Sequence, residues 1–122
     1  MRVMVIVKAT NDSEDGKLPT PELIEQMGAF NQQLMDAGIF IDAAGLKPSA
    51  KGARVAFSST NRSVTKGPFP NVHELVAGYW IWKVNDLNEA IEWVKRCPNP
   101  MPGPPVIEIR QLYEEEDFDQ SK

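Results

Sequence analysis

The chain has 122 residues, a length that fits one domain and leaves no room for a second. Its 13 Lys and Arg face 17 Asp and Glu, a net charge of -4, and no stretch is basic enough to predict a nucleic-acid-binding surface. A single cysteine excludes an intrachain disulfide, and the short apolar stretch near the N-terminus predicts neither a signal peptide nor a membrane span, so we expect a cytoplasmic protein.

The first part of the chain predicts a strand, a helix and a second strand. Residues 2–9 are β-branched and apolar on both faces apart from Lys8, which favours a central strand. A polar loop is expected over residues 10–19. The helix then begins at Thr20, an N-cap followed by Pro21, and ends at Gly38. Its apolar stripe comprises Leu23, Ile24, Met27, Phe30, Leu34 and Met35, and a strand follows over residues 39–46.

The second part of the chain predicts a hairpin and a second strand–helix–strand unit. A capping box at Asp86–Glu89 begins the helix, which Pro98 ends, and Leu87, Ala90, Ile91 and Val94 form its buried stripe. The other expected segments are a weak hairpin over 54–58 and 63–65 turning at Thr60-Asn61, a loop over 66–70, a helical turn over 72–76, an aromatic strand over 77–84, a stiff proline-rich connection over 98–105 and a strand over 106–112.

The order of these elements is β-α-β, an inserted hairpin, then β-α-β, which is the split βαβ pattern of an α+β, ferredoxin-like fold. We expect an antiparallel sheet with two helices on one face and an open face that carries Trp, Met and Ile side chains among charged ones. A second copy of the chain would cover that face and give a homodimer in which two sheets form a dimeric α/β-barrel. We expect one domain over residues 1–113 and an acidic tail over 114–122.

Several short segments carry a family resemblance by their order and spacing. They are MVIVKA near the start, Gly45-Leu46-Lys47-Pro48, Lys51-Gly52-Ala53-Arg54, Gly67-Pro68-Phe69, Glu74-Leu75, Ala77-Gly78-Tyr79-Trp80, the helix EAIEWVKRCPNPMPG, Ile107-Glu108-Ile109-Arg110 and Glu116-Asp117-Phe118. Together they resemble the YCII-related proteins, in particular the DGPF-domain subgroup. The resemblance implies a dimeric α/β-barrel and little about activity. It also implies two functions to consider. Some members of the subgroup are encoded beside sigma factors, and some wider relatives resemble hydrolytic or dehydrochlorinating enzymes with a His–Asp pair.

The chain departs from the subgroup at its signature. Lys66 stands where the signature acid is expected, and residues 70–74 replace a segment that is typically AETKE. His73, the only histidine, occupies the usual lysine position of that segment. Beside Glu74 it is the best catalytic candidate, because an imidazole with a carboxylate partner can act as a general base near neutral pH. The alternative is a surface histidine, since side chains of adjacent residues often point apart.

Six further residues are candidates for ligand binding. Glu108 and Arg110 alternate with Ile107 and Ile109, so we expect the charged pair on the open sheet face, where Arg110 would hold an anion or form a structural ion pair. The remaining candidates are Lys8, Asp42, Arg54 and Tyr79. Trp80 and Trp82 would stack a ring or fill the core, and Cys97 is expected to pack as a small hydrophobic residue.

Motifs for nucleotide, serine-hydrolase, zinc and dithiol chemistry are absent from the sequence, so we expect no cofactor and no metal. Three functions stay open. The first is a small-molecule-binding or accessory protein with a pocket in each half of the dimer, for an anionic or aromatic ligand. The second is a cofactor-free lyase or hydrolase that uses His73 with a carboxylate. The third is a regulatory interaction module linked to sigma-factor systems. Whether the chain is an enzyme is left undecided.

Overall fold

The computed structural model describes residues 1–101 and 106–119. Its four-stranded sheet has the order β2-β5-β1-β6, formed by β1 (Arg2–Lys8), β2 (Phe40–Gly45), β5 (Val76–Lys83) and β6 (Ile107–Gln111). Every pairing in it is antiparallel. The strand β1 is central, as its continuous apolar sequence predicts, and the split βαβ, ferredoxin-like α+β fold is confirmed.

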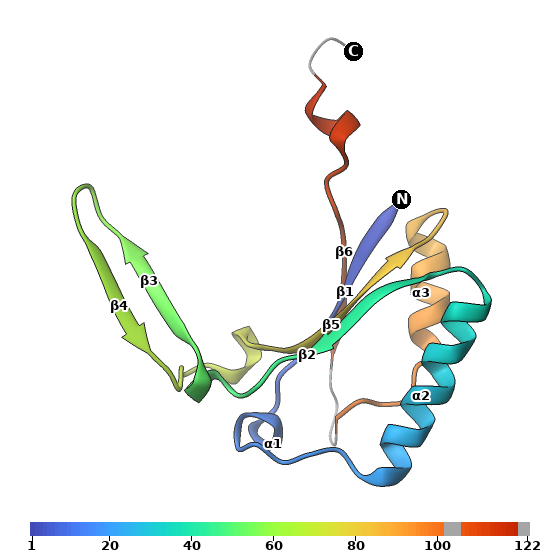
Figure 1. Ribbon diagram of the computed structural model, residues 1–122, viewed down its shortest axis with the longest axis horizontal. Helices are drawn as coiled ribbons and strands as arrows, with labels where there is room; N and C mark the ends of the chain where they lie inside the picture. The colour runs from blue at the N-terminus through green and yellow to red at the C-terminus, as the bar shows by residue number, and fades with distance from the viewer. Residues whose placement is uncertain (102–105, 120–122) are drawn as a thin grey trace.

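Two helices, α2 (Pro21–Asp36) and α3 (Leu87–Lys95), cover one face of the sheet (Figure 1). Thr20 caps α2 as expected, since its hydroxyl accepts a hydrogen bond from Leu23 N at 3.1 Å. The chain leaves this helix through Gly38, whose φ of +73° is a left-handed conformation that glycine adopts without strain. At the start of α3 the cap differs from a capping box, because Glu89 accepts from Asn85 N rather than from the N-cap Asp86.

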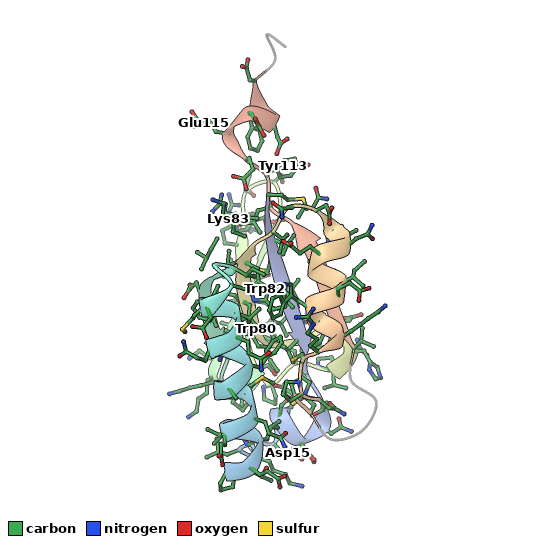
Figure 2. All side chains as sticks on the ribbon, turned by 90° about the vertical axis from the view of Figure 1, so that its right-hand side faces the viewer. Asp15, Trp80, Trp82, Lys83, Tyr113 and Glu115 are labelled. Carbon is green, nitrogen blue, oxygen red and sulfur yellow. The ribbon has the colours of Figure 1, made fainter. Side chains whose placement is uncertain are left out.

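The core lies between the helices and the sheet. Val3 pairs with Trp82 and Val5 with Trp80, so these four side chains share the helix face of the sheet, where all are buried. Figure 2 shows Trp80 and Trp82 between the two helices. The expectation of Trp on the open face is therefore wrong, because the register of β5 turns Tyr79 and Ile81 to that face instead. Within the expected stripe of α2, Ile24 and Met35 are exposed.

The inserted hairpin forms a separate arm. Its strands β3 (Ala53–Phe57) and β4 (Arg62–Lys66) make a two-stranded sheet of their own, and every residue of both strands is exposed. Figure 1 shows the arm projecting on the side of the sheet opposite α2 and α3. Short 3-10 turns, η1 (Ser49–Lys51) before β3 and η2 (Val72–Glu74) before β5, flank it. The arm therefore stands beside the open face and is not packed on the core.

Two segments contain short helical turns that the sequence analysis does not predict. The polar loop after β1 contains a short helix, α1 (Asn11–Glu14), because Thr10 and Ser13 form a reciprocal capping box. The acidic tail contains η3 (Glu115–Phe118) and is tied to β1, since Arg2 pairs with Glu114 through two hydrogen bonds of 3.0 and 3.1 Å. That hydrogen bond lowers the pKa of the Glu114 carboxyl. Of the proline-rich connection expected over 98–105, residues 102–105 lie outside the described part of the chain.

Candidate functional site

A pocket of about 560 Å³ opens on the helix side of the sheet, between α2 and the strands β2 and β5. Ligand sites in proteins usually enclose about 300–1,000 Å³ and are mostly apolar. Small residues leave this space unfilled, because Gly28 on α2 has no atom within 4 Å of where a Cβ would lie and Ala43 on β2 carries only a methyl group. Around them lie the larger apolar side chains of Leu23, Ile24, Met27, Trp80 and Met101.

The described residues that line this pocket include three with uncharged polar groups, Asn31, Tyr79 and Trp80, and none with a charged group. Trp80 donates its indole Nε1–H to Asn31 Oδ1 at 2.8 Å. Because an indole N–H can only donate, this bond fixes the amide orientation and leaves the Asn31 Nδ2 donors without a partner among the described residues. The pocket can thus hold an uncharged molecule that offers one hydrogen-bond acceptor.

The open face of the sheet gathers most of the predicted binding residues. Glu108 lies between two cations, with Lys8 Nζ at 3.7 Å from Oε1 and Arg110 Nη1 at 3.3 Å from Oε2. These side chains are at least partly exposed, so their pairing is screened by water and contributes little to stability. Within one chain Arg110 thus forms an ion pair with Glu108. This structural ion pair is one of the two roles that the sequence analysis gives for Arg110.

The remaining binding candidates do not form one cluster. Asp42 and Tyr79 face the same side as Glu108 and Arg110, since the register places them in rows across the sheet with Met4 and Ile6. Arg54, in contrast, lies on the arm, where its guanidinium stacks 4.0 Å above the centroid of the Phe69 ring. The alternation of side chains along a strand thus predicts which residues lie on the open face, but it does not predict that Arg54 lies on a separate arm.

His73 lies exposed in η2, next to the equally exposed Glu74. Neither side chain forms a hydrogen bond or ion pair with any described residue, and neither lines the pocket beneath α2. His73 therefore has no carboxylate partner among the described residues, and a general-base role for it stays a hypothesis. The described residues also contain no cluster of three His, Cys, Asp or Glu side chains that is suited to a metal ion.

Cys97 follows α3 and packs half-buried against the core, with its thiol donating to the Pro98 carbonyl at 3.2 Å. Burial disfavours the thiolate and raises the pKa of this thiol from 9.0 to about 11. The reactive species is the thiolate, so the native thiol is expected to be poorly nucleophilic at pH 8.

We expect a disulfide reagent to modify Cys97 about 100-fold more slowly in the native chain than in urea at pH 8, since the thiolate fraction falls tenfold per pKa unit. The native rate should rise as the pH approaches 11, while the unfolded rate levels off above pH 9. By the same linkage, burial of the neutral thiol favours the folded state below pH 9 and this contribution is lost between pH 9 and 11. Equal modification rates in the native and unfolded chains at pH 8 would contradict the burial of the thiol. The Cys97→Ala variant, which has no thiol, gives the background rate.

The pocket beneath α2 was not predicted from the sequence. Glycines and alanines from three separate elements line it, namely Gly28, Ala43, Ala44, Gly45, Ala77 and Gly78. Each of these residues is compatible with an ordinary helix or strand. Only the packing of α2 on β2 and β5 brings them together, so no motif or periodicity in the sequence indicates the cavity.

The family described as YCII-related domain matches residues 1–116. An uncharacterized protein of Rhizobium meliloti (strain 1021) is 23% identical over 107 residues, which cover 88% of this chain and 82% of that protein. In the part of the chain that the structure describes, no helix has the length and apolar character needed to cross a membrane.

One solved structure resembles this fold over nearly its full length. It is 5-chloro-2-hydroxyhydroquinone dehydrochlorinase from Burkholderia phenoliruptrix AC1100, in complex with 2,5-dihydroxybenzoquinone. The TM-score is 0.53 at 12% sequence identity, covering 98% of this chain and 100% of that one. At this identity the likeness extends to the fold alone.

Proposed function

The chain belongs to the YCII-related domain family, and on that premise we propose that it binds a small, uncharged, ring-containing molecule in the pocket beneath α2. The observation that carries the proposal is the pocket itself: about 560 Å³, apolar, without charge among its described lining residues, and with one oriented amide donor at Asn31. A flat apolar ring suits a space between a helix and a sheet. The Asn31 Nδ2 group would donate to a hydroxyl or carbonyl oxygen of the ligand.

Two further considerations support this choice. The structurally similar dehydrochlorinase is a complex with a quinone, a planar ring that carries oxygen acceptors. Of the anionic or aromatic ligands considered from the sequence, the uncharged aromatic class suits this pocket better, because an anion would enter it without a cation to offset its desolvation.

The assembly and the subgroup are also proposals. We propose that the open face, with Met4, Ile6 and Ile81 among its charged residues, packs against a second copy of the chain to form a homodimer. Membership of the DGPF subgroup is proposed on the segments around Gly67-Pro68-Phe69 and Glu116-Asp117-Phe118. Light scattering that reports the single-chain mass of 13.6 kDa at micromolar concentration would refute the homodimer.

Isothermal titration with 2-naphthol and its anionic counterpart 2-naphthoate tests the pocket. We expect 2-naphthol to bind with a Kd on the order of 0.1–1 mM, as is usual for a ligand of this size, and 2-naphthoate to bind at least ~10-fold more weakly. In nitrogen–proton NMR spectra, the indole N–H resonance that shifts most should be the one lost in Trp80→Phe, since Trp80 lines the pocket.

A matched pair of helix variants locates the binding. Gly28→Leu places a side chain in the pocket, where a Cβ meets no atom within 4 Å, so 2-naphthol binding should be lost without harm to the helix. Ala29→Leu adds the same group at an exposed position of α2 that does not line the pocket, and should bind as the parent chain does. If Gly28→Leu binds 2-naphthol as tightly as Ala29→Leu does, the pocket is not the binding site.

A further inference from the structure

The arm formed by β3 and β4 exposes an apolar face of its own. Val55 is opposite Val64 in the hairpin register, and Phe57 lies on the same face two residues along the strand. Their exposed fractions are 54% for Val55, 62% for Val64 and 76% for Phe57. Apolar side chains gathered on one exposed face of a two-stranded ribbon indicate a surface that another segment covers, because an isolated hairpin is only marginally stable in water.

Positive charge surrounds this arm. The sequence contains no Asp or Glu between Asp42 and Glu74, while that interval holds five cations, Lys47, Lys51, Arg54, Arg62 and Lys66. The register puts Arg62 and Lys66 on the same face as Val55, Phe57 and Val64, and Arg62 stacks 4.4 Å above the centroid of the Phe57 ring. The segment that covers the arm should therefore be acidic and should carry apolar side chains.

The tail of this chain has that character. Tyr113 and Phe118 stack with ring centroids 5.1 Å apart, yet they remain 75% and 67% exposed. Five acids lie at residues 114–117 and 119, and the Glu115 and Glu116 side chains form no hydrogen bond or ion pair with any described residue. The aromatic pair with its acids thus complements the arm in both polarity and charge.

Within one chain the arm and the described part of the tail lie apart. The arm leaves the sheet where β2 ends and β5 begins, beside Lys8 at the end of β1, whereas the tail follows β6 beside Arg2 at the start of β1. Figure 1 shows them at opposite ends of the sheet, and Figure 2 shows Tyr113 and Glu115 well beyond it. A tail segment that covers the arm would therefore come from another copy of the chain.

We propose that the arm of one copy binds the tail segment Tyr113–Asp119 of a second copy, and that the contact is made twice in a two-fold dimer. This inference rests on the proposed homodimer and adds how its two sheets are oriented relative to each other. When two sheets pack face to face, a two-fold axis perpendicular to the strands brings the arm end of one sheet to the tail end of the other. Because the arm projects on the open-face side, it lies on the side where that second copy packs.

Charge reversal in two separate variants tests the contact. The arm variant is Arg62→Glu with Lys66→Glu, and the tail variant is Glu115→Lys with Glu116→Lys. Each variant alone opposes like charges at both contacts, so we expect its homodimer to dissociate roughly 10- to 100-fold more readily than the parent. In an equimolar mixture both contacts of the heterodimer regain opposite charges, and native mass spectrometry should find clearly more heterodimer than the roughly one half of a random mixture.

A control variant distinguishes this contact from a general effect of charge. Ser63→Glu with Thr65→Glu places two acids on the opposite face of the same strand, and should leave the dimer mass and the dissociation constant unchanged. If both reversed variants dimerise as the parent does and mix at random, the arm–tail contact is refuted while a dimer through the open face stands. If the parent chain itself is monomeric, both proposals fall, whereas ligand binding in the pocket beneath α2 is decided separately by the 2-naphthol titration.

Discussion

Trp82→Ala is expected to lower the free energy of unfolding by about 3–5 kcal/mol, the usual cost of truncating a large core aromatic residue. Trp82 has no solvent exposure and is the largest of the fully buried side chains of the described core. Its ring lies 5.8 Å from that of Trp80 and 6.3 Å from that of Phe30, between centroids. Removing it leaves a cavity in the core between the helices and the sheet. Urea unfolding at a fixed chain concentration measures the change.

Trp82→Phe separates the packing of this residue from its polarity. The indole Nε1 of Trp82 is buried and has no hydrogen-bond partner among the described residues, and such a donor costs about 1–3 kcal/mol. Phenylalanine removes the donor and keeps one ring, so the loss of volume and the relief of the donor offset each other, and we expect a change within about 1 kcal/mol. Leu18→Ala, at an 87% exposed position, supplies the control that should not change stability. A Trp82→Ala effect as small as that of Leu18→Ala would contradict the proposed core.

The fold was predictable because its strongest signals are local. Thr20 and Gly38 delimit α2 through a cap and a left-handed residue, and both act through the backbone of their own segment. The alternation of Ile107 and Ile109 with Glu108 likewise depends only on strand geometry, and the register confirms the predicted face. Each of these inferences needs no knowledge of what lies across the sheet.

The face of β5 could not be assigned in this way. In the segment AGYWIWKV, large side chains occupy both alternating sets, so the sequence is compatible with either face toward the helices. The pairing of Val3 with Trp82 decides it, because Val3 is buried beneath the helices. The hairpin shows that an apolar strand sequence does not by itself predict burial. Val55 and Val64 are β-branched and apolar, as buried strand residues often are, yet both are exposed on the arm.

The candidate site was even less accessible from the sequence. The charges of Lys8, Glu108 and Arg110 mark them as binding candidates in the sequence, and the structure brings them together as an ion-paired group on the open face. The pocket instead depends on the missing side chain at Gly28 and on the orientation of an amide at Asn31. Absence of volume leaves no pattern in a sequence, so only the packed helix and sheet disclose it.

Gly67→Ala is expected to destabilise the chain by about 1–3 kcal/mol or more, the range for forcing extra atoms into a packed region. A Cβ on Gly67 would lie 1.8 Å from the carbonyl oxygen of Ser49 and 2.6 Å from its carbonyl carbon. Both are backbone atoms of η1, which cannot move aside as a flexible side chain can. The backbone of η1 or of the arm must therefore shift.

Movement of Ser49 is costly because this residue joins three segments. Its backbone N–H donates to Glu14 Oε2 at 2.8 Å and its hydroxyl donates to the same carboxylate, while the hydroxyl also accepts from Phe69 N at 3.0 Å. Gly67 N in turn donates to Gly52 O at 3.0 Å. The root of the arm is thus held by one compact network that links α1, η1 and the segment after β4.

Gly52→Ala is a matched control, because its Cβ would lie 3.5 Å from the same Ser49 oxygen, an ordinary contact. Its φ of -115° suits any residue. We therefore expect Gly52→Ala to unfold near the parent midpoint in urea and Gly67→Ala to unfold at a clearly lower one. If the arm root sets the direction of the arm, Gly67→Ala should also weaken dimerisation, while Gly52→Ala should not. Coincident midpoints for the two variants would show that the backbone at Ser49 yields freely and that the root does not hold the arm in place.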